Sequence, residues 1–139
     1  QKTELARLDW EMILKKYKYA GCVINTAKSG EAGKHWVCIF IDIPEGRIEY
    51  FNSTGRSAPD EIQTFAALTI KAIRDLIGKT WTFEEVTKVQ HQHHNSECGM
   101  YAIFYITSRL DGESYTKFTG DKIPDEFIET LRPKFFRHS

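Results

Sequence analysis

The sequence predicts a single α+β domain, and three features of its apolar pattern carry this prediction. Two stretches have apolar residues at helical spacing, one stretch is apolar on both faces as in a central strand, and helical and extended stretches occupy separate parts of the chain. The chain has 139 residues and no repeat, low-complexity tract or linker, so residues 1–139 are expected to form one domain.

The N-terminal half is expected to hold a helix, a short strand and a β-hairpin. The helix covers residues 4–18, where polar residues separate apolar ones, and the short strand covers residues 20–25. Residues 35–43 are apolar on both faces for most of their length, which is typical of a central strand. A turn at residues 44–46 leads into the returning strand at residues 47–52.

The C-terminal half is expected to be mainly helical. Residues 59–77 show amphipathic helical spacing that ends at Gly78, and residues 81–89 alternate loosely as a strand. The stretch 97–109 is apolar nearly all round, so this helix is expected in the core, and a last helix is expected at residues 124–136. The apolar stripe of the long helix comprises Ile62, Phe65, Ala66, Ile70, Ile73 and Ile77.

Charge and cysteine content limit the classes of function. The 19 Lys and Arg residues balance 19 Asp and Glu residues, and without a basic cluster the chain is not expected to bind nucleic acid. No run of about 18 apolar residues is present, so no membrane span is expected. Three cysteines, a small and odd number, suit a reducing compartment rather than secretion. Because the first residue is Gln1 and not Met, we expect the chain to be cut from a longer protein.

Cys98 is the candidate nucleophile because it follows a polar loop and begins the predicted core helix. Free backbone N–H groups and the positive end of the helix dipole favour a thiolate at such a position. Gly99 has no side chain, which lets a substrate backbone approach closely. Cys22 and Cys38 lie inside predicted strands and are expected to be small buried apolar groups.

A nucleophilic thiol needs a base, and His35 at the start of the hairpin is the candidate. Asn52 ends the returning strand, so both residues are expected at the same end of the hairpin, where the amide can orient the imidazole. Asp42 is a poorer orienter because it lies about 23 Å along the same strand, at about 3.3 Å per residue. Gln92 precedes Cys98 by six residues and is the candidate side-chain donor of an oxyanion hole.

These residues also carry a family resemblance. Their order and spacing over residues 20–106 resemble the ubiquitin-like-protein protease and adenovirus-protease superfamily, peptidase clan CE. Within it, the chain is similar to the polyprotein-processing proteases of large DNA viruses, such as African swine fever virus. The motifs are Ile24-Asn25-Thr26, Gly33-Lys34-His35-Trp36, Tyr50-Phe51-Asn52-Ser53, Gln92, and Asn95-Ser96-Glu97-Cys98-Gly99-Met100-Tyr101.

The resemblance implies a papain-like, adenain-like core in which a small mixed sheet packs on a buried helix that carries the nucleophile. It implies that Trp36, and Gly99 beside the nucleophile, contact the substrate in a narrow cleft that selects small residues, typically glycine, before the scissile bond. Much of the family has Asp where this chain has Asn52, and a neutral amide fixes the imidazole tautomer but supports the imidazolium less. The implied catalytic residues are Cys98 as nucleophile, His35 as general base, Asn52 as orienter and Gln92 as oxyanion donor.

The implied function is a cysteine endopeptidase that cleaves after Gly-Gly or Gly-X-Gly-like sequences in viral polyproteins, in the host cytoplasm or the virion. No cofactor or metal is expected. Two alternatives stay open: a protease that removes ubiquitin-like or SUMO-like proteins, and a catalytically degenerate binding module of the same fold. A metal site at His91, His93, His94 and Cys98 is disfavoured, because no second Cys-x-x-Cys or His-x3-His pair accompanies them and a solvated loop explains them.

Overall fold

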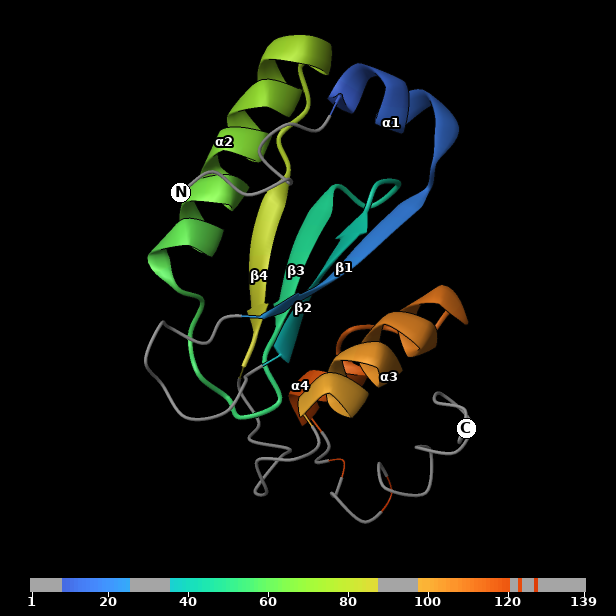
Figure 1. Cartoon of the computed structure of the whole chain (residues 1–139). Coiled ribbons are helices and arrows are strands. Elements are labelled where there is room, and N and C mark those ends of the chain that lie inside the picture. Colours follow the sequence, from blue (N-terminus) through green and yellow to red (C-terminus); the bar gives the residue numbers. More distant parts are fainter. Residues whose placement is uncertain (1–8, 26–35, 88–97, 121–122, 124–126, 128–139) are drawn as a thin grey trace, which may run out of the picture.

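The protein is a layered α+β fold, seen in a computed structural model (Figure 1). A four-stranded sheet lies between two layers of helices, with α1 and α2 on one face and α3 and α4 on the other. This architecture confirms the predicted fold class. The structure describes residues 9–25, 36–87, 98–120, 123 and 127.

The sheet has strand order β1-β2-β3-β4. The first three strands pair antiparallel, and β4 joins β3 in parallel, so the sheet is mixed, as the family resemblance implied. The longer connection from β3 to β4 contains α2, which a parallel pair requires because a tight turn cannot join parallel strands. The strands are β1 (Tyr19–Asn25), β2 (Trp36–Asp42), β3 (Arg47–Phe51) and β4 (Thr82–Val86).

The β2–β3 hairpin forms the centre of the sheet, as its doubly apolar sequence predicted. Every residue of β2 after Trp36 is buried, because both faces of the strand are covered by helices. The turn closes with Gly46 donating its N–H to the carbonyl of Ile43 at 3.1 Å. Gly46 has φ +67°, and a Cβ there would lie 2.8 Å from Cδ1 of Trp81. Glycine is therefore required at this turn both by conformation and by close packing.

Two helices cover the first face of the sheet. Helix α1 (Trp10–Lys16) begins after Asp9, whose carboxylate accepts the Met12 N–H at 3.3 Å, and ends before the extended Tyr17. Helix α2 (Asp60–Ile77) follows Pro59 and ends at Gly78 with φ 72°. The predicted stop at Gly78 is confirmed.

The apolar stripe of α2 packs on the sheet together with the inward side chains of β2 and β3. This first core, which we call the α2 face, has apolar or aromatic members throughout. One prediction is wrong: Ile77 is 45% exposed, because the sheet does not extend under the last turn of the helix. The buried members of the α2 face are Val37, Ile39, Ile41, Ile48, Tyr50, Ala58, Ile62, Phe65, Ala66, Ile73 and Trp81.

The opposite face is covered by α3 (Cys98–Leu110) and by the short α4 (Lys117–Gly120). The α3 helix matches the prediction for residues 97–109 and packs on β2 and β1. The four-residue α4 was not predicted, and the helix expected at residues 124–136 falls outside the described residues apart from Phe127. The buried members of this α3 face are Cys38, Phe40, Phe51, Val86, Met100, Tyr101, Ala102, Tyr105, Phe118 and Ile123.

A helix that spans a membrane must reach a certain length and hydropathy. Among the described segments, none of the helices is both long and apolar enough to cross a bilayer.

Candidate active site

The start of β2 and the end of β3 meet at one end of the sheet, as the hairpin prediction requires. Cys38 pairs with Phe51, so continuing this register by one residue sets Val37 opposite Asn52. Val37 is two residues after His35. The end of the parallel strand β4 lies at the same edge, because Phe51 pairs with Val86 (Figure 1).

Asn52 follows β3 directly and is 3% exposed. Its side-chain Nδ2 donates to the Tyr50 hydroxyl at 3.3 Å, and its Oδ1 accepts the Thr54 N–H at 3.0 Å and the Thr54 hydroxyl at 2.7 Å. Contacts at both ends of the amide fix its plane and direction. Burial raises the pKa of Tyr50, whereas the Asn52 hydrogen bond opposes that shift, so the phenol stays protonated at neutral pH. Asn52 is therefore a neutral polar group held in one orientation.

Cys98 and Gly99 are the first two residues of α3, which places the candidate nucleophile at a helix N-terminus as predicted. Met100 and Tyr101 follow in the same first turn and are buried in the core that also contains Phe51. Tyr101 donates its hydroxyl to the carbonyl of Ile123 at 2.7 Å, which ties this turn to the chain after α4. The first turn of α3 thus packs in the same core cluster as the end of β3.

Trp36 is the first residue of β2, is half-buried and pairs with Asn25 at the edge strand. It lies at the same end of the hairpin as Asn52. His35 and Gln92 lie outside the described residues, so their assigned roles remain predictions. Among the described residues, Asn52 and Trp36 lie at the same end of the hairpin, and Phe51, next to Asn52, shares a core cluster with Met100 and Tyr101 of the first turn of α3.

Asp42 lies at the opposite end of β2, beside the hairpin turn. It accepts a hydrogen bond from Nη2 of Arg109 at 2.9 Å and forms a longer ion pair with Arg47 at 3.4 Å. A carboxylate held there is remote from Asn52, in agreement with the expectation that Asp42 is a poor orienter.

The two other cysteines differ in burial. Cys38 is fully buried, as predicted, and burial raises the pKa of its thiol well above the ordinary value, with Glu49 acting in the same direction. Cys22 is only partly buried, because β1 is an edge strand, so the prediction of a buried group is wrong for this residue. Burial also raises the pKa of Cys22. Both thiols are therefore protonated at neutral pH, unlike an activated nucleophile.

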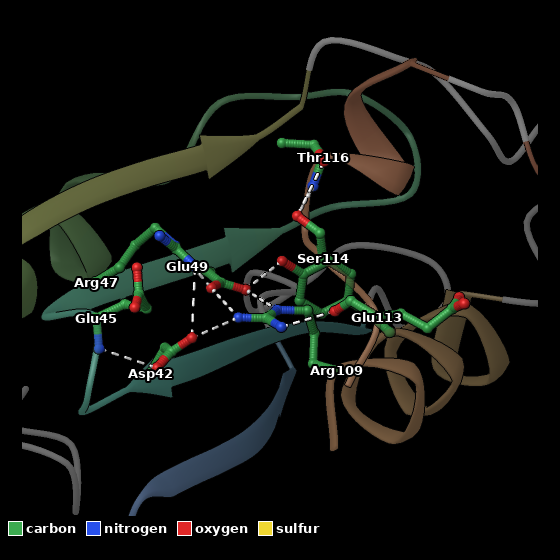
Figure 2. A network of polar contacts seen from close by, with 9 residues as sticks. Asp42, Glu45, Arg47, Glu49, Arg109, Glu113, Ser114 and Thr116 are labelled. Atoms are coloured by element: carbon green, nitrogen blue, oxygen red, sulfur yellow. Dashed lines mark hydrogen bonds and ion pairs between the residues drawn. The ribbon is translucent and has the colours of Figure 1, made fainter. Parts of the chain in front are cut away.

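A buried polar cluster that the sequence did not reveal joins α3 to the hairpin (Figure 2). Its members are Asp42, Arg47, Glu49, Tyr105 and Arg109. The only hints in the sequence were single charged residues inside apolar stretches, such as Glu49 between Ile48 and Tyr50, and no spacing rule connects residues 60 positions apart.

Metal ligands are not gathered in the described part of the chain: no group of three His, Cys, Asp or Glu residues there could hold an ion. Of the disfavoured metal cluster, His91, His93 and His94 lie outside the described residues. The described geometry is instead that of a helix beginning at a cysteine, packed beside the end of a hairpin that carries a fixed amide.

This arrangement is that of a cysteine protease fold, which the chain shares with a solved viral protease. The family model described as the Ulp1 protease family, C-terminal catalytic domain, matches residues 8–138. The chain belongs to this cysteine protease family.

Relatives at the sequence level are viral. The chain is 37% identical over 136 residues to the SUMO-1 cysteine protease of African swine fever virus isolate Pig/Kenya/KEN-50/1950, an alignment covering 96% of this chain and 50% of that protein. The chain therefore spans about half the length of the curated relatives it matches.

Solved structures give the same fold. A crystal structure of the African swine fever virus protease superposes with a TM-score of 0.81 at 39% identity, covering 88% of this chain and 45% of that one. ChlaDub1 of Chlamydia trachomatis superposes with a TM-score of 0.63 at 14% identity, covering 91% and 61% of the two chains. The SUMO protease Ulp1 gives a TM-score of 0.55 at 18% identity, covering 79% and 53%. The last two likenesses concern the fold alone.

Proposed function

We propose that this chain carries the catalytic residues of a cysteine endopeptidase, with Cys98 as nucleophile and His35 as general base. The Cys98 Sγ bonds to the substrate carbonyl carbon while the thiol proton passes to His35. His35 returns that proton to the amine as the C–N bond breaks, leaving a thioester. Water then attacks the thioester carbonyl as His35 takes one of its protons, the C–S bond breaks with the thiolate of Cys98 leaving, and the carboxylic acid product is released.

The observation that carries this proposal is the fixed amide of Asn52 at the end of β3, next to Phe51, which shares a core cluster with the first turn of α3. An orienting group must hold the imidazole in one tautomer, and a buried amide anchored by Tyr50 and Thr54 has a defined direction. The opening turn of α3 supplies a dipole that favours a thiolate at Cys98. Gln92 is proposed to donate to the developing oxyanion together with the Cys98 N–H.

Substitutions at the proposed residues test these roles. Cys98→Ala is expected to abolish turnover while retaining substrate binding, and Gln92→Ala to lower kcat by about 10²–10³-fold. Asn52→Asp should retain activity, since a carboxylate also orients imidazole, whereas Asn52→Ala should lose most of it. Equal turnover by all three residues at position 52 contradicts the role of Asn52.

For the substrate, we propose cleavage after small residues in Gly-Gly or Gly-X-Gly-like sequences of viral polyproteins, with Trp36 and Gly99 contacting the residues before the cut. The support is the viral origin of the relatives and the position of Trp36 at the same end of the hairpin as Asn52. Mass-spectrometric profiling of a peptide library tests this directly. Enrichment of glycine at the two positions before the cut is expected, and enrichment of large or charged residues there contradicts it.

A second candidate is a protease that removes a ubiquitin-like protein, favoured because the viral relative is named a SUMO-1 cysteine protease. A ubiquitin-like or SUMO vinyl sulfone that labels Cys98 favours this candidate. Failure of such probes to label Cys98, with efficient cleavage of short Gly-rich peptides, favours polyprotein processing. The degenerate binding module predicts neither labelling nor cleavage.

A thiolate nucleophile must remain reduced, so we propose that the protein works in a reducing compartment such as the host cytoplasm, or in the virion. The free, protonated states of Cys22 and Cys38 fit this setting.

A further inference from the structure

The polar cluster between β3 and α3 is centred on Glu49, whose side chain is 0% exposed. Its Oε1 accepts from the Tyr105 hydroxyl at 2.5 Å and from Arg109 Nε at 2.8 Å. Its Oε2 accepts from Arg109 Nη2 at 2.8 Å and from Arg47 Nε at 3.0 Å. The Glu49 carboxylate thus accepts two hydrogen bonds from the Arg109 guanidinium, one from the Tyr105 hydroxyl and one from Arg47.

Arg109 extends the cluster to β2 and to the loop after the helix. Its Nη2 also donates to Asp42 at 2.9 Å, and its Nη1 donates to the Glu113 carbonyl at 2.7 Å (Figure 2). Its guanidinium lies 4.9 Å from the Phe40 ring centroid. Two arginines face two carboxylates, so the charges balance within the cluster. The Glu49 hydrogen bonds raise the pKa of Arg109, which keeps it charged despite its burial.

Such a cluster is a costly way to stabilise a fold. The free energy lost by removing the two charges from water offsets most of the attraction between them. Apolar residues of similar volume often stabilise the folded state to the same extent. What ion pairs add is direction, because a guanidinium fork accepts a carboxylate in few geometries, whereas apolar side chains slide past one another at little cost.

The contacts that Glu49 makes with Tyr105 and Arg109 join β3, which leads to Asn52, to α3, which begins at Cys98. Glu49 is on β3, three residues before Asn52. On α3, Cys98, Tyr105 and Arg109 fall on one face, since steps of seven and eleven residues return to nearly the same direction at 3.6 residues per turn. The face of α3 that contacts Glu49 is therefore the face on which its first residue lies.

We propose that the Glu49–Arg109–Tyr105 contact is a positioning device: it fixes the rotation and axial position of α3 on β3 and thereby sets Cys98 relative to Asn52. The inference rests on the proposed function, because it assigns these residues to the alignment of that site. None of the three touches substrate. They act through the helix and the strand.

Arg109→Lys tests this proposal because it keeps the positive charge and removes the two-point guanidinium contact with Glu49. Tyr105→Phe is the second variant, because it removes the hydroxyl that donates to Glu49 and keeps the ring. The matched control comes from the α2 face: Ile73→Val or Ile73→Ala, whichever lowers the Tm by the same amount. All are measured well below Tm, with concentrations corrected for the folded fraction.

We expect Arg109→Lys to lower kcat by about 10- to 100-fold with little change in KM, because a shift near 1 Å misaligns the reacting groups. The pH profile of Cys98 alkylation should move toward that of a free thiol. The Ile73 control should change neither quantity. Equal kcat and pH profiles in the Arg109 variant and the control overturn the proposal.

Amide hydrogen exchange tests, independently of activity, whether this contact holds the first turn of α3 in place. Faster exchange at residues 98–102 in Arg109→Lys, absent from the Ile73 control, supports positioning of the first turn from the far end of the helix. Exchange that rises only near residue 109 overturns it. If wild-type Cys98 reacts like a free thiol, the proposed function fails, and this exchange comparison still tests the contact.

Discussion

The α2 face and the α3 face are built on the same strands but differ in what their helices bring to the sheet. Helix α2 contributes Ile62, Phe65, Ala66 and Ile73, and its contact with the sheet is apolar. Helix α3 contributes apolar residues in its first turns and then Tyr105 and Arg109, which bind Glu49 and Asp42.

The apolar α2 contact and the ion-paired α3 contact differ in how strongly they fix the position of a helix. Apolar burial supplies free energy in proportion to area and has little directional preference. Hydrogen-bonded ion pairs supply less net free energy but define one arrangement. The directional contacts occur on the helix that begins at Cys98, where displacement would move a proposed catalytic atom. Helix α2, which carries no proposed catalytic residue, packs on the sheet mainly through apolar burial.

The largest expected effect comes from removing the cation of the α3 face. Arg109→Met should cost about 3–5 kcal/mol of unfolding free energy, because Glu49 and Asp42 lose their buried partner. Urea denaturation measures this value. A loss below about 1 kcal/mol would show that the carboxylates find other partners and that the ion pairs add little direction.

On the α2 face, Ile73→Ala should cost about 3 kcal/mol, because a fully buried side chain leaves a cavity. The same denaturation experiment measures it, and turnover per folded molecule should stay at the wild-type level. If turnover falls by more than the fraction of unfolded protein explains, the α2 face also positions the catalytic residues, and the proposed difference between the two faces is wrong.

A smaller effect is expected for Tyr105→Phe, about 1–2 kcal/mol, because Glu49 keeps both contacts with Arg109 and loses one hydroxyl donor. The ring should still stack on Phe51, which lies 4.5 Å away between centroids. Thermal unfolding checks the magnitude. A larger loss than that of Arg109→Met would place the hydroxyl, and not the guanidinium, at the centre of the cluster.

The smallest expected effect is on the pH dependence of folding stability. The Cys38 thiol has a folded-state pKa raised by burial above its ordinary value of 9.0, so the folded state holds its proton longer than the unfolded state. Its contribution to stability is therefore complete below pH 9.0 and is lost as the pH rises toward the folded-state pKa, at up to about 1.4 kcal/mol per pH unit.

Cys38→Ala should flatten the fall of Tm between pH 8 and pH 10, and Cys22→Ala, at a partly exposed position, should flatten it less. The slope that remains in Cys38→Ala includes contributions from Cys22, Tyr50 and Tyr105, whose pKa values burial also raises. Identical slopes in wild type and Cys38→Ala would show that Cys38 does not contribute.

The sequence predicted the hairpin, the long helix and the core helix well, because each depends on a local pattern. A strand apolar on both faces, apolar residues at helical spacing, Gly46 at a turn and Gly78 after a helix are each recognised within a few residues. The position of Asn52 at the same end as the start of β2 followed from hairpin geometry alone.

What the sequence did not reveal depends on distant partners. Arg109 and Glu49 are 60 positions apart, and their pairing exists only once α3 packs against the sheet. The exposure of Ile77 has the same origin, since helical spacing says nothing about where the sheet beneath a helix ends. The four-residue α4 is too short to produce a periodic pattern.

The central claim is that Cys98 and His35 form an activated pair held by Asn52, and the rate of Cys98 alkylation by iodoacetamide tests it most directly. Mass spectrometry separates Cys98 from Cys22 and Cys38, whose raised pKa values should make them slow internal references. We predict rapid alkylation of Cys98 near neutral pH that falls to the rate of an ordinary thiol in His35→Ala. An ordinary rate in the wild-type protein, unchanged by His35→Ala, would contradict the account.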